Sequence, residues 1–290
     1  VCYLARVEDR SALRRAVCEV VTFGGERLTE QQLNEEIVAH EQRMLGQMDL
    51  PPSIAANESL CENVFMIAVC AQLKIPLFIV GKPGQSKSLS KNLVAASMLG
   101  PNSQTELFRM LMRLECTTFQ CSPQTTSEAI EAAALRAQES VPQTERARVI
   151  PCLVLDELGL AESDSKMALK VLHKLLDQTD KEFEQRVAYI GISNWALDSA
   201  KMNRGILVLR SDAKEQELLT TSIGICSVDG KVNPRISGLL RPLTSAYERV
   251  LKLMQRRMVS RTFFGQRDYI HFVKHLHFDL MLGRGRVDRQ

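Results

Sequence analysis

The stretch of sequence that decides the fold is Gly81-Lys82-Pro83-Gly84-Gln85-Ser86-Lys87-Ser88. It follows an apolar run over residues 75–80 and leads into residues 89–96, a segment typical of a helix. The order is strand, glycine-containing turn and helix. In such a turn the backbone N–H groups and the helix N-terminus point toward negative charge, so the stretch predicts a loop that binds polyphosphate.

Within this loop the sequence assigns individual roles. We expect Lys87 to reach the β- and γ-phosphates of ATP and the Ser88 hydroxyl to bind Mg²⁺. Ser86 stands where glycine usually precedes the lysine, so its Cβ would crowd the phosphate or its hydroxyl would add a hydrogen bond. The alternative for the octamer is a glycine turn of the kind any α/β protein contains. The expected nucleotide contacts are Gly81, Lys82, Pro83, Gly84, Gln85, Ser86, Lys87, Ser88 and Leu89.

A second apolar run, residues 149–155, ends in two acids, Asp156 and Glu157. A continuous apolar run of this length is typical of a buried parallel strand, and the carboxyl ends of such strands face the ligand crevice. We expect Asp156 to hold Mg²⁺ and Glu157 to orient or deprotonate the attacking water. The alternative is that both acids simply begin a solvated loop.

A third strand, residues 187–193, places Asn194 at its end. An amide there is suited to bonding the γ-phosphate or the attacking water, and the alternative is a turn or helix-capping residue. Further along, Arg204 is a candidate arginine finger that acts on the nucleotide of a neighbouring module. A surface salt bridge or a helix cap is the alternative for Arg204.

This order of parts resembles an AAA+ ATPase. Longer strings resemble the mysterin family, giant ring-finger E3 ubiquitin ligases that carry several AAA+ modules in one chain. The resemblance runs from about Asn57 to about His275 and is carried by residues 75–88, 119–123, 154–162, 191–198, 200–206 and 263–268. In that family serine can stand at the position of Ser86.

The resemblance implies an α/β fold: a P-loop AAA+ core with a parallel sheet between helices, and a C-terminal helical lid. We expect a helical extension and linker over 1–56, the core over 57–210 and the lid over 211–290. The family pattern makes Asn194 the first sensor, places Arg204 near the finger position and makes Arg267 the second sensor, although Arg267 also fits a solvated lid residue. The expected catalytic set is Glu157, Asn194, Arg204 and Arg267, acting with ATP and Mg²⁺.

The expected function is an ATP hydrolase module that turns Mg-ATP binding and hydrolysis into conformational change. The alternatives are a slow-turnover clasp or switch that holds ATP, and a scaffold with an inactive site. The resemblance implies neighbouring AAA+ modules in the same long chain, and ubiquitin machinery that engages regions outside this sequence. No Cys-x-x-Cys pair is present, so a ring-type zinc site has no ligands and the ligase domain is absent here.

Composition limits the classes of partner that we expect. The net charge of +3 and the aromatic content of 5% favour neither nucleic acid nor an acidic membrane surface. Eight cysteines without tight spacing are typical of free thiols in a reducing compartment, so we expect a cytoplasmic protein. The longest apolar stretch, residues 64–80, is interrupted by Lys74 and Pro76, which argues against a transmembrane segment. The chain lacks an initiating methionine, and we expect it to be part of a longer one.

Periodicity and turn residues predict the remaining elements. His271 and His275 share one face of the last predicted helix, either as a metal-binding pair or, more simply, as surface residues. Thr29 is a candidate N-cap. Residues 177–185 are expected to form a solvated loop, and the alternative is an insertion that faces a pore or a partner. Helices are expected over 4–21, 28–48, 61–73, 127–139, 165–177, 214–219, 236–256 and 269–282, and strands over 114–121 and 206–209.

Overall fold

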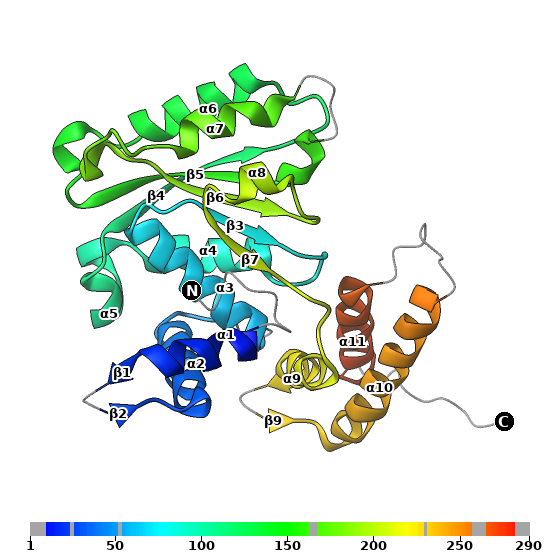
Figure 1. Cartoon of the computed structure of the whole chain (residues 1–290). Coiled ribbons are helices and arrows are strands. Elements are labelled where there is room, and N and C mark those ends of the chain that lie inside the picture. Colours follow the sequence, from blue (N-terminus) through cyan, green and yellow to red (C-terminus); the bar gives the residue numbers. More distant parts are fainter. Residues whose placement is uncertain are drawn as a thin grey trace. The chain divides into compact units, whose positions relative to one another are not determined.

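The computed structural model describes residues 10–23, 26–51, 54–162, 167–228, 231–256 and 265–281 (Figure 1). They group into two compact units by backbone proximity. The first unit comprises residues 1–49, 61–81 and 86–211, and the second comprises residues 50–60, 82–85 and 212–290. The N-terminal helices thus fall within the first unit, whereas the predicted three-part division at 56 and 210 stays a prediction.

The first unit is built on a five-stranded sheet in the order β4-β5-β6-β3-β7. Every neighbouring pair in it is parallel. The strands are β3 (Leu77–Val80), β4 (Arg113–Gln120), β5 (Val149–Asp156), β6 (Ala188–Ser193) and β7 (Ile206–Leu209). The predicted α/β fold with a parallel sheet is therefore confirmed.

The central strands are buried because helices cover both faces of the sheet. Each residue of β3 and β6 is buried, as the apolar runs predicted. In Figure 1, α3 (Glu58–Gln72) and α4 (Lys87–Ser97) lie on one side of the sheet, and α6 (Ser127–Glu139) and α7 (Leu172–Leu176) lie on the other. On the α6 face, Phe78, Leu153, Leu155 and Tyr189 share a core with Ile130. Burying these side chains supplies the main driving force for the fold.

The N-terminal part of the first unit is a helical hairpin. Helix α1 (Arg10–Val20) leads through the short strands β1 (Thr22–Phe23) and β2 (Glu26–Arg27) into α2 (Glu30–Gly46). Thr29 caps α2 as predicted: its hydroxyl accepts from Gln32 N, and the Gln32 side chain accepts from Thr29 N. This reciprocal pair satisfies two amides at the helix start.

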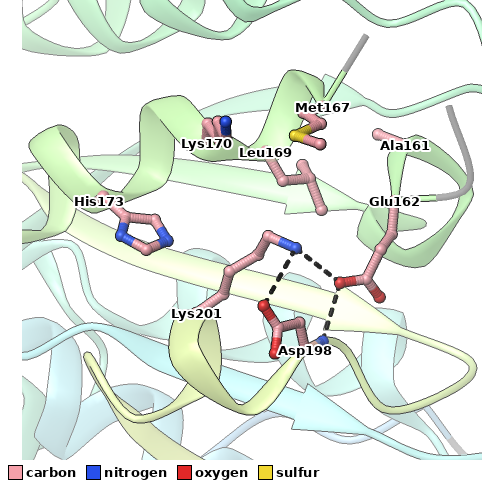
Figure 2. Close-up of a pocket in the computed structure, with 8 residues that line it drawn as sticks. All are labelled: Ala161, Glu162, Met167, Leu169, Lys170, His173, Asp198 and Lys201. Atoms are coloured by element: carbon pink, nitrogen blue, oxygen red, sulfur yellow. Dashed lines mark hydrogen bonds and ion pairs between the residues drawn. The ribbon is translucent and has the colours of Figure 1, made fainter. Parts of the chain in front are cut away.

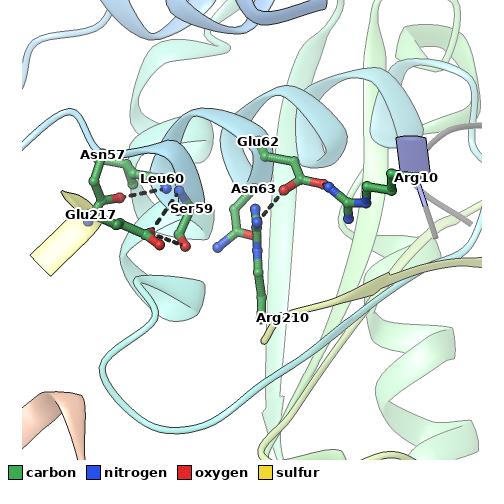
Figure 3. Close-up of polar contacts among 8 residues, drawn as sticks. All are labelled: Arg10, Asn57, Ser59, Leu60, Glu62, Asn63, Arg210 and Glu217. Atoms are coloured by element: carbon green, nitrogen blue, oxygen red, sulfur yellow. Dashed lines mark hydrogen bonds and ion pairs between the residues drawn. The ribbon is translucent and has the colours of Figure 1, made fainter. Parts of the chain in front are cut away.

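A buried ion network ties α1 to α3 and to the end of β7 (Figure 3). One oxygen of the Glu62 carboxylate lies 2.7 Å from Arg10 Nη1, and the other pairs with Arg210 Nη1. Arg210 Nε also donates to Asn63 Oδ1 at 3.0 Å. All three ionic side chains are almost inaccessible to solvent. Breaking a buried pair leaves an uncompensated charge, so this network fixes α1 against α3.

The second unit is mainly helical and holds α9 (Glu215–Cys226), α10 (Pro234–Arg256) and α11 (Gln266–Met281), with the strand pair β8 (Ser227–Val228) and β9 (Lys231–Val232). Leu218, Ile236, Leu240 and Val273 lie in its core. Tyr269 is buried there too, with its hydroxyl 2.6 Å from Thr244 Oγ1. The segment before α3 belongs to this unit, where Asn57 Nδ2 donates to Thr221 Oγ1 at 2.9 Å. Ser59 N donates to Glu217 Oε1 at 3.2 Å (Figure 3).

Some predicted elements are corrected. The continuous helix expected over 165–177 is wrong: a 3₁₀ turn η5 (Ala168–Val171) precedes α7, and Met167 has a positive φ of 48° that a helix does not tolerate. Residues 163–166 lie outside the described residues, as do residues 4–9 of the first predicted helix. The segment 177–185 is not wholly a solvated loop, because Gln178 is buried and bonds both N and O of Val187 at 2.9 Å.

The remaining predicted helices and strands are present, with α6 and β7 at the predicted bounds and the others shifted by a few residues. Helix α9 runs to Cys226, where a helix ending at 219 was expected. Among the described helices, none combines the length and apolarity needed to cross a membrane. The short elements that the sequence did not predict are η2 (Gly100–Asn102), α5 (Glu106–Arg109), η3 (Gln143–Glu145), η4 (Leu158–Ala161), η6 (Phe183–Gln185) and α8 (Ser199–Met202).

Candidate functional site

The carboxyl ends of three neighbouring strands bring the predicted motifs to one edge of the sheet. Val80 of β3 is paired with Ser193 of β6, so Gly81 and Asn194 leave the sheet side by side. Gly81 N donates to Ser193 O at 3.1 Å. Leu155 of β5 is paired with Gly191, which places the acid pair after it at the same edge. Ligands of open parallel sheets bind at this edge, where strands adjacent in space are not consecutive in the chain.

The backbone conformation of Ser86 shows why glycine usually precedes the lysine of a phosphate loop. Ser86 is the N-cap of α4 with φ 55° and ψ 15°, a left-handed conformation that glycine adopts more easily. Glycine is therefore usual here because of its backbone freedom. At Ser86 the left-handed conformation costs about 1–2 kcal/mol. The Ser86 carbonyl accepts from Ser90 Oγ at 2.7 Å, which ties the loop to the first turn of α4.

The loop fits an anion. Helix α4 has eleven residues, and the Ser86 side chain caps none of its first amides. Lys87 is buried, and its ammonium donates to the carbonyl of Gly81, across the mouth of the loop. Ser88, the next residue, is exposed. A helix start that its N-cap side chain does not cap, with a lysine held beside it, is the arrangement that a phosphate group needs.

The middle of the loop, residues 82–85, groups with the second unit. Lys82 Nζ lies 2.7 Å from Asp212 Oδ1. Gly84 has a φ of +97°, and a Cβ there would lie 2.8 Å from the backbone N of Arg267. Glycine is therefore required at position 84 for two reasons, backbone conformation and space.

The acid pair lies at the end of β5, where the chain turns sharply. Asp156 Oδ1 accepts from Glu157 N at 2.9 Å. Glu157 is exposed and has a left-handed φ of 52°, so its side chain departs from the strand direction where the chain enters η4. A non-glycine residue held in this region is uncommon, and such residues cluster at functional sites.

The turn after β6 is packed against η4. A Cβ on Gly159 would lie 2.6 Å from both Ser193 Oγ and Trp195 Nε1, so the glycine permits this close approach. Ser193 Oγ donates to Trp195 O at 2.6 Å and accepts from Trp195 N at 3.3 Å, which shapes the turn that contains Asn194. Sequence reasoning missed the positioning role of Ser193, although a serine that ends an apolar strand was a usable signal.

Arg204 does not lie at this edge of the sheet. Arg204 is exposed and precedes β7, whose first residue, Ile206, donates its N–H to Pro76 O at 2.8 Å. Pro76 lies before β3, so Arg204 lies at the amino edge, opposite the phosphate loop of its own unit. Arg267 is the second residue of α11 in the second unit and is exposed.

The histidine pair belongs to the second unit. His271 and His275 are exposed on α11. In the part of the chain that the structure describes, no three His, Cys, Asp or Glu side chains gather as a metal site would require. Metal binding at the pair therefore has no support from a third ligand.

A pocket of about 570 Å³ lies in the first unit between η4, η5 and α8 (Figure 2). Glu162 Oε1 accepts from Lys201 Nζ and from Asp198 N, each at 2.8 Å. Sequence reasoning missed this pocket, although Glu162 and Asp198 end two of the strings that carried the resemblance. Its lining residues are Ala161, Glu162, Met167, Leu169, Lys170, His173, Asp198 and Lys201.

Together, the sheet order, the loop after β3 and the acid pair after β5 define an AAA+ module. A solved structure agrees on the fold: the ADP form of the Aeropyrum pernix ORC2 protein matches with a TM-score of 0.52 and 14% identity, over 84% of this chain and 69% of that one.

The family follows from sequence comparison. Residues 53–217 match the family described as the RNF213 AAA domain. The chain is 41% identical over 280 residues to the E3 ubiquitin-protein ligase RNF213 of Homo sapiens and 38% identical over 281 residues to rnf213-beta of Danio rerio. It belongs to the RNF213 AAA domain family, which confirms the resemblance to mysterin-type ligases. The matches cover 94% and 95% of this chain and 5% of each relative, so the chain spans about a twentieth of their length.

Proposed function

We propose that the chain is an ATP-hydrolysing AAA+ module that converts Mg-ATP binding and turnover into conformational change. One observation carries the proposal. The phosphate loop, the acid pair and Asn194 leave three adjacent parallel strands at the same edge of the sheet, in the register set by Gly81 N and Ser193 O at 3.1 Å. The intact Lys87, Ser88, Asp156, Glu157 and Asn194 argue against a scaffold with an inactive site.

Each side chain then has a role. Lys87 exchanges the Gly81 carbonyl for phosphate oxygens and neutralises their charge, while the amides of α4 bond the same group. Ser88 and Asp156 hold Mg²⁺, which when bound with ATP screens the charge on the phosphates. Glu157 accepts the proton of the attacking water, and Asn194 orients that water. The carboxylate of Glu157 is exposed and so accessible to water.

The position of Arg204 favours the slow-turnover clasp whenever no neighbouring module supplies an arginine finger. Because Arg204 lies at the amino edge, it does not complete the site of its own unit, and we propose that it serves a neighbouring module as a finger in trans. Without a finger from a neighbour, the module would hold ATP and turn it over slowly, as a clasp. Arg267 is proposed as the second sensor on resemblance alone.

The family supports proposals about the longer chain. Since the relatives are named as E3 ubiquitin-protein ligases, we propose that this module serves as part of the motor of such a ligase, beside further AAA+ modules in one chain and in the cytoplasm. The ligase chemistry belongs to regions outside these 290 residues.

The test measures Mg-dependent ATP binding and phosphate release in the same samples, with wild type beside Lys87→Ala. Lys87-dependent binding with release supports the proposal. Lys87-dependent binding without release supports the clasp, and an added neighbouring module should then restore turnover. Absence of binding by the wild-type chain would overturn both.

A further inference from the structure

Two cysteines face each other across neighbouring strands below the candidate site. Cys116 of β4 and Cys152 of β5 are direct partners in the parallel ladder. Adjacent strands lie about 4.8 Å apart, which falls within the Cα separation of roughly 4.4–6.8 Å that disulfides accept. Because partners in register point to the same face, the two thiols are neighbours, and a hydrogen bond joins them.

The pair lies on the α4 face of the sheet. Leu153 and Leu155 point into the core beneath α6. Because successive side chains of a strand point to opposite faces, Cys152 points to the other face. Lys91 of α4 acts on both thiols from that side. Cys152 lies four residues before Asp156 on β5, so a bond formed there would join the strand that carries the acid pair to edge strand β4.

Cys116 differs from the other thiols in access and charge. Of the cysteines that the structure describes, it alone is not buried. The hydrogen bond from Cys152 lowers the pKa of Cys116, and Lys91 acts in the same direction against partial burial and Glu115. By contrast, burial raises the pKa of Cys70 and of Cys121 to about 12. Thiolate character and access together decide which cysteine reacts.

We propose that Cys116 and Cys152 form a reversible modification site for peroxides, in which Cys116 is the attacking thiol and Cys152 the resolving thiol.

The chemistry balances with hydrogen peroxide as the oxidant. The Cys116 thiolate attacks one peroxide oxygen, an S–O bond forms, the O–O bond breaks, and the departing hydroxide takes a proton to become water. The Cys152 sulfur then attacks the Cys116 sulfur, so that the S–S bond forms and the S–O bond breaks. The hydroxyl leaves with the Cys152 thiol proton as a second water. The two sulfurs lose two electrons, which reduce one peroxide to two waters.

The first experiment compares thiols within one protein. The reduced 290-residue chain is exposed to limiting iodoacetamide at neutral pH, and each cysteine is quantified by mass spectrometry. We expect Cys116 to be labelled roughly tenfold faster than the buried Cys70 and Cys226, which serve as internal controls. Equal or slower labelling of Cys116 would overturn the proposal.

The second experiment measures formation of the disulfide between Cys116 and Cys152. Hydrogen peroxide should remove two thiols per chain, link Cys116 to Cys152 in the non-reducing peptide map, and be reversed by dithiothreitol. Cys152→Ser and Cys152→Ala should stop at a sulfenic acid on Cys116 that dimedone traps, and Cys226→Ser should behave as wild type. A link between other cysteines, or no link in the folded wild-type chain, would show that the pair is only structural.

Discussion

The two edges of the five-stranded sheet are made of the same strands and differ in chemistry. At the carboxyl edge, β3, β5 and β6 end in the phosphate loop, the acid pair and Asn194. Left-handed non-glycine residues occur at both edges, Ser86 and Glu157 at this one and Lys74 at the other. At the amino edge the polar groups bond within the protein. Lys74 Nζ donates to Phe183 O at 2.9 Å and lies 4.6 Å from the Phe183 ring centroid.

This difference separates the edge that stabilises the fold from the edge that carries the candidate site. The amino edge uses its polar groups internally, as Lys74 does, and packs backbone on backbone where Gly205 meets Pro76. The carboxyl edge keeps the exposed carboxylate of Glu157 and a helix start that its N-cap side chain does not cap. Substitutions at the first edge should therefore change stability, and substitutions at the second should change binding and turnover.

The largest expected effect comes from the same chemical change made at each edge. Glu157→Gln at the carboxyl edge should retain ATP and lower turnover by about 10²- to 10⁴-fold, because the amide does not accept the proton of water. Glu184→Gln, at an exposed position near Lys74, should leave turnover unchanged. Phosphate release under saturating ATP measures both, and unchanged turnover in Glu157→Gln would refute the assignment of the base.

The second effect concerns binding. Lys87→Ala should weaken ATP binding by about 2–3 kcal/mol, or roughly 30- to 150-fold, since it removes a charge-assisted bond to phosphate. Arg204→Ala should leave the affinity of its own module within about twofold, a difference of less than 1 kcal/mol. Titration calorimetry on both variants makes the comparison, and a loss of affinity in Arg204→Ala would show that the amino edge contributes to the site.

A third change should destabilise the amino edge alone. A Cβ on Gly205 would lie 2.5 Å from the carbonyl oxygen of Pro76, which is backbone and does not move aside easily. Gly205→Ala should lower the free energy of unfolding by about 1–3 kcal/mol. Gly46→Ala in the same unit, where nothing lies within 4 Å, is the matched control and should cost nothing. Urea unfolding compares them, and equal midpoints would contradict the close approach.

A smaller effect is expected at the phosphate loop. Ser86→Gly should raise the free energy of unfolding by about 1 kcal/mol, because glycine adopts a φ of 55° without the Cβ penalty. Ser97→Gly, at the other end of α4, should be neutral or destabilising. If Ser86→Gly lost stability, the serine would have to be making contacts that outweigh its backbone strain.

The smallest effect is a pH dependence at Lys74. Burial lowers the pKa of Lys74 to about 8, with Arg146 contributing in the same direction. Between pH 8 and the unfolded value of 10.5, the unfolded chain keeps the proton that the native chain has lost, so stability should rise with pH relative to Lys74→Met. Over the first pH unit above 8 the gain should be about 1 kcal/mol, because one unit of pKa difference corresponds to about 1.36 kcal/mol. Denaturation of both proteins on either side of pH 8 measures it, and a difference that falls with pH would reverse the sign.

Much of the first unit was predictable because its strands are short apolar runs that end in polar motifs. Residues 206–209 and 127–139 were predicted to the residue, since apolar patterning and flanking turn residues fix them. The segment 165–177 was not, because the positive φ of Met167 depends on tertiary packing that periodicity does not encode.

For the candidate site, the sequence identified the residues but not their neighbours. Lys87, Asp156 and Asn194 were visible because each follows a predicted strand. The turn shaped by Ser193 and Gly159 was invisible, since it depends on contact between two strand ends that are 34 residues apart in sequence. The partnership of Cys116 and Cys152 likewise required the register of β4 against β5.

The buried network of Arg10, Glu62 and Arg210 has a consequence for how this module is cut from a longer chain. The segment that the family shares begins at residue 53, after α1 and α2. A fragment begun there would keep Glu62 and Arg210 in the interior and discard Arg10, which lies 2.7 Å from the same carboxylate. The stretch that matches the family is thus shorter than the stretch that pairs both oxygens of this buried carboxylate.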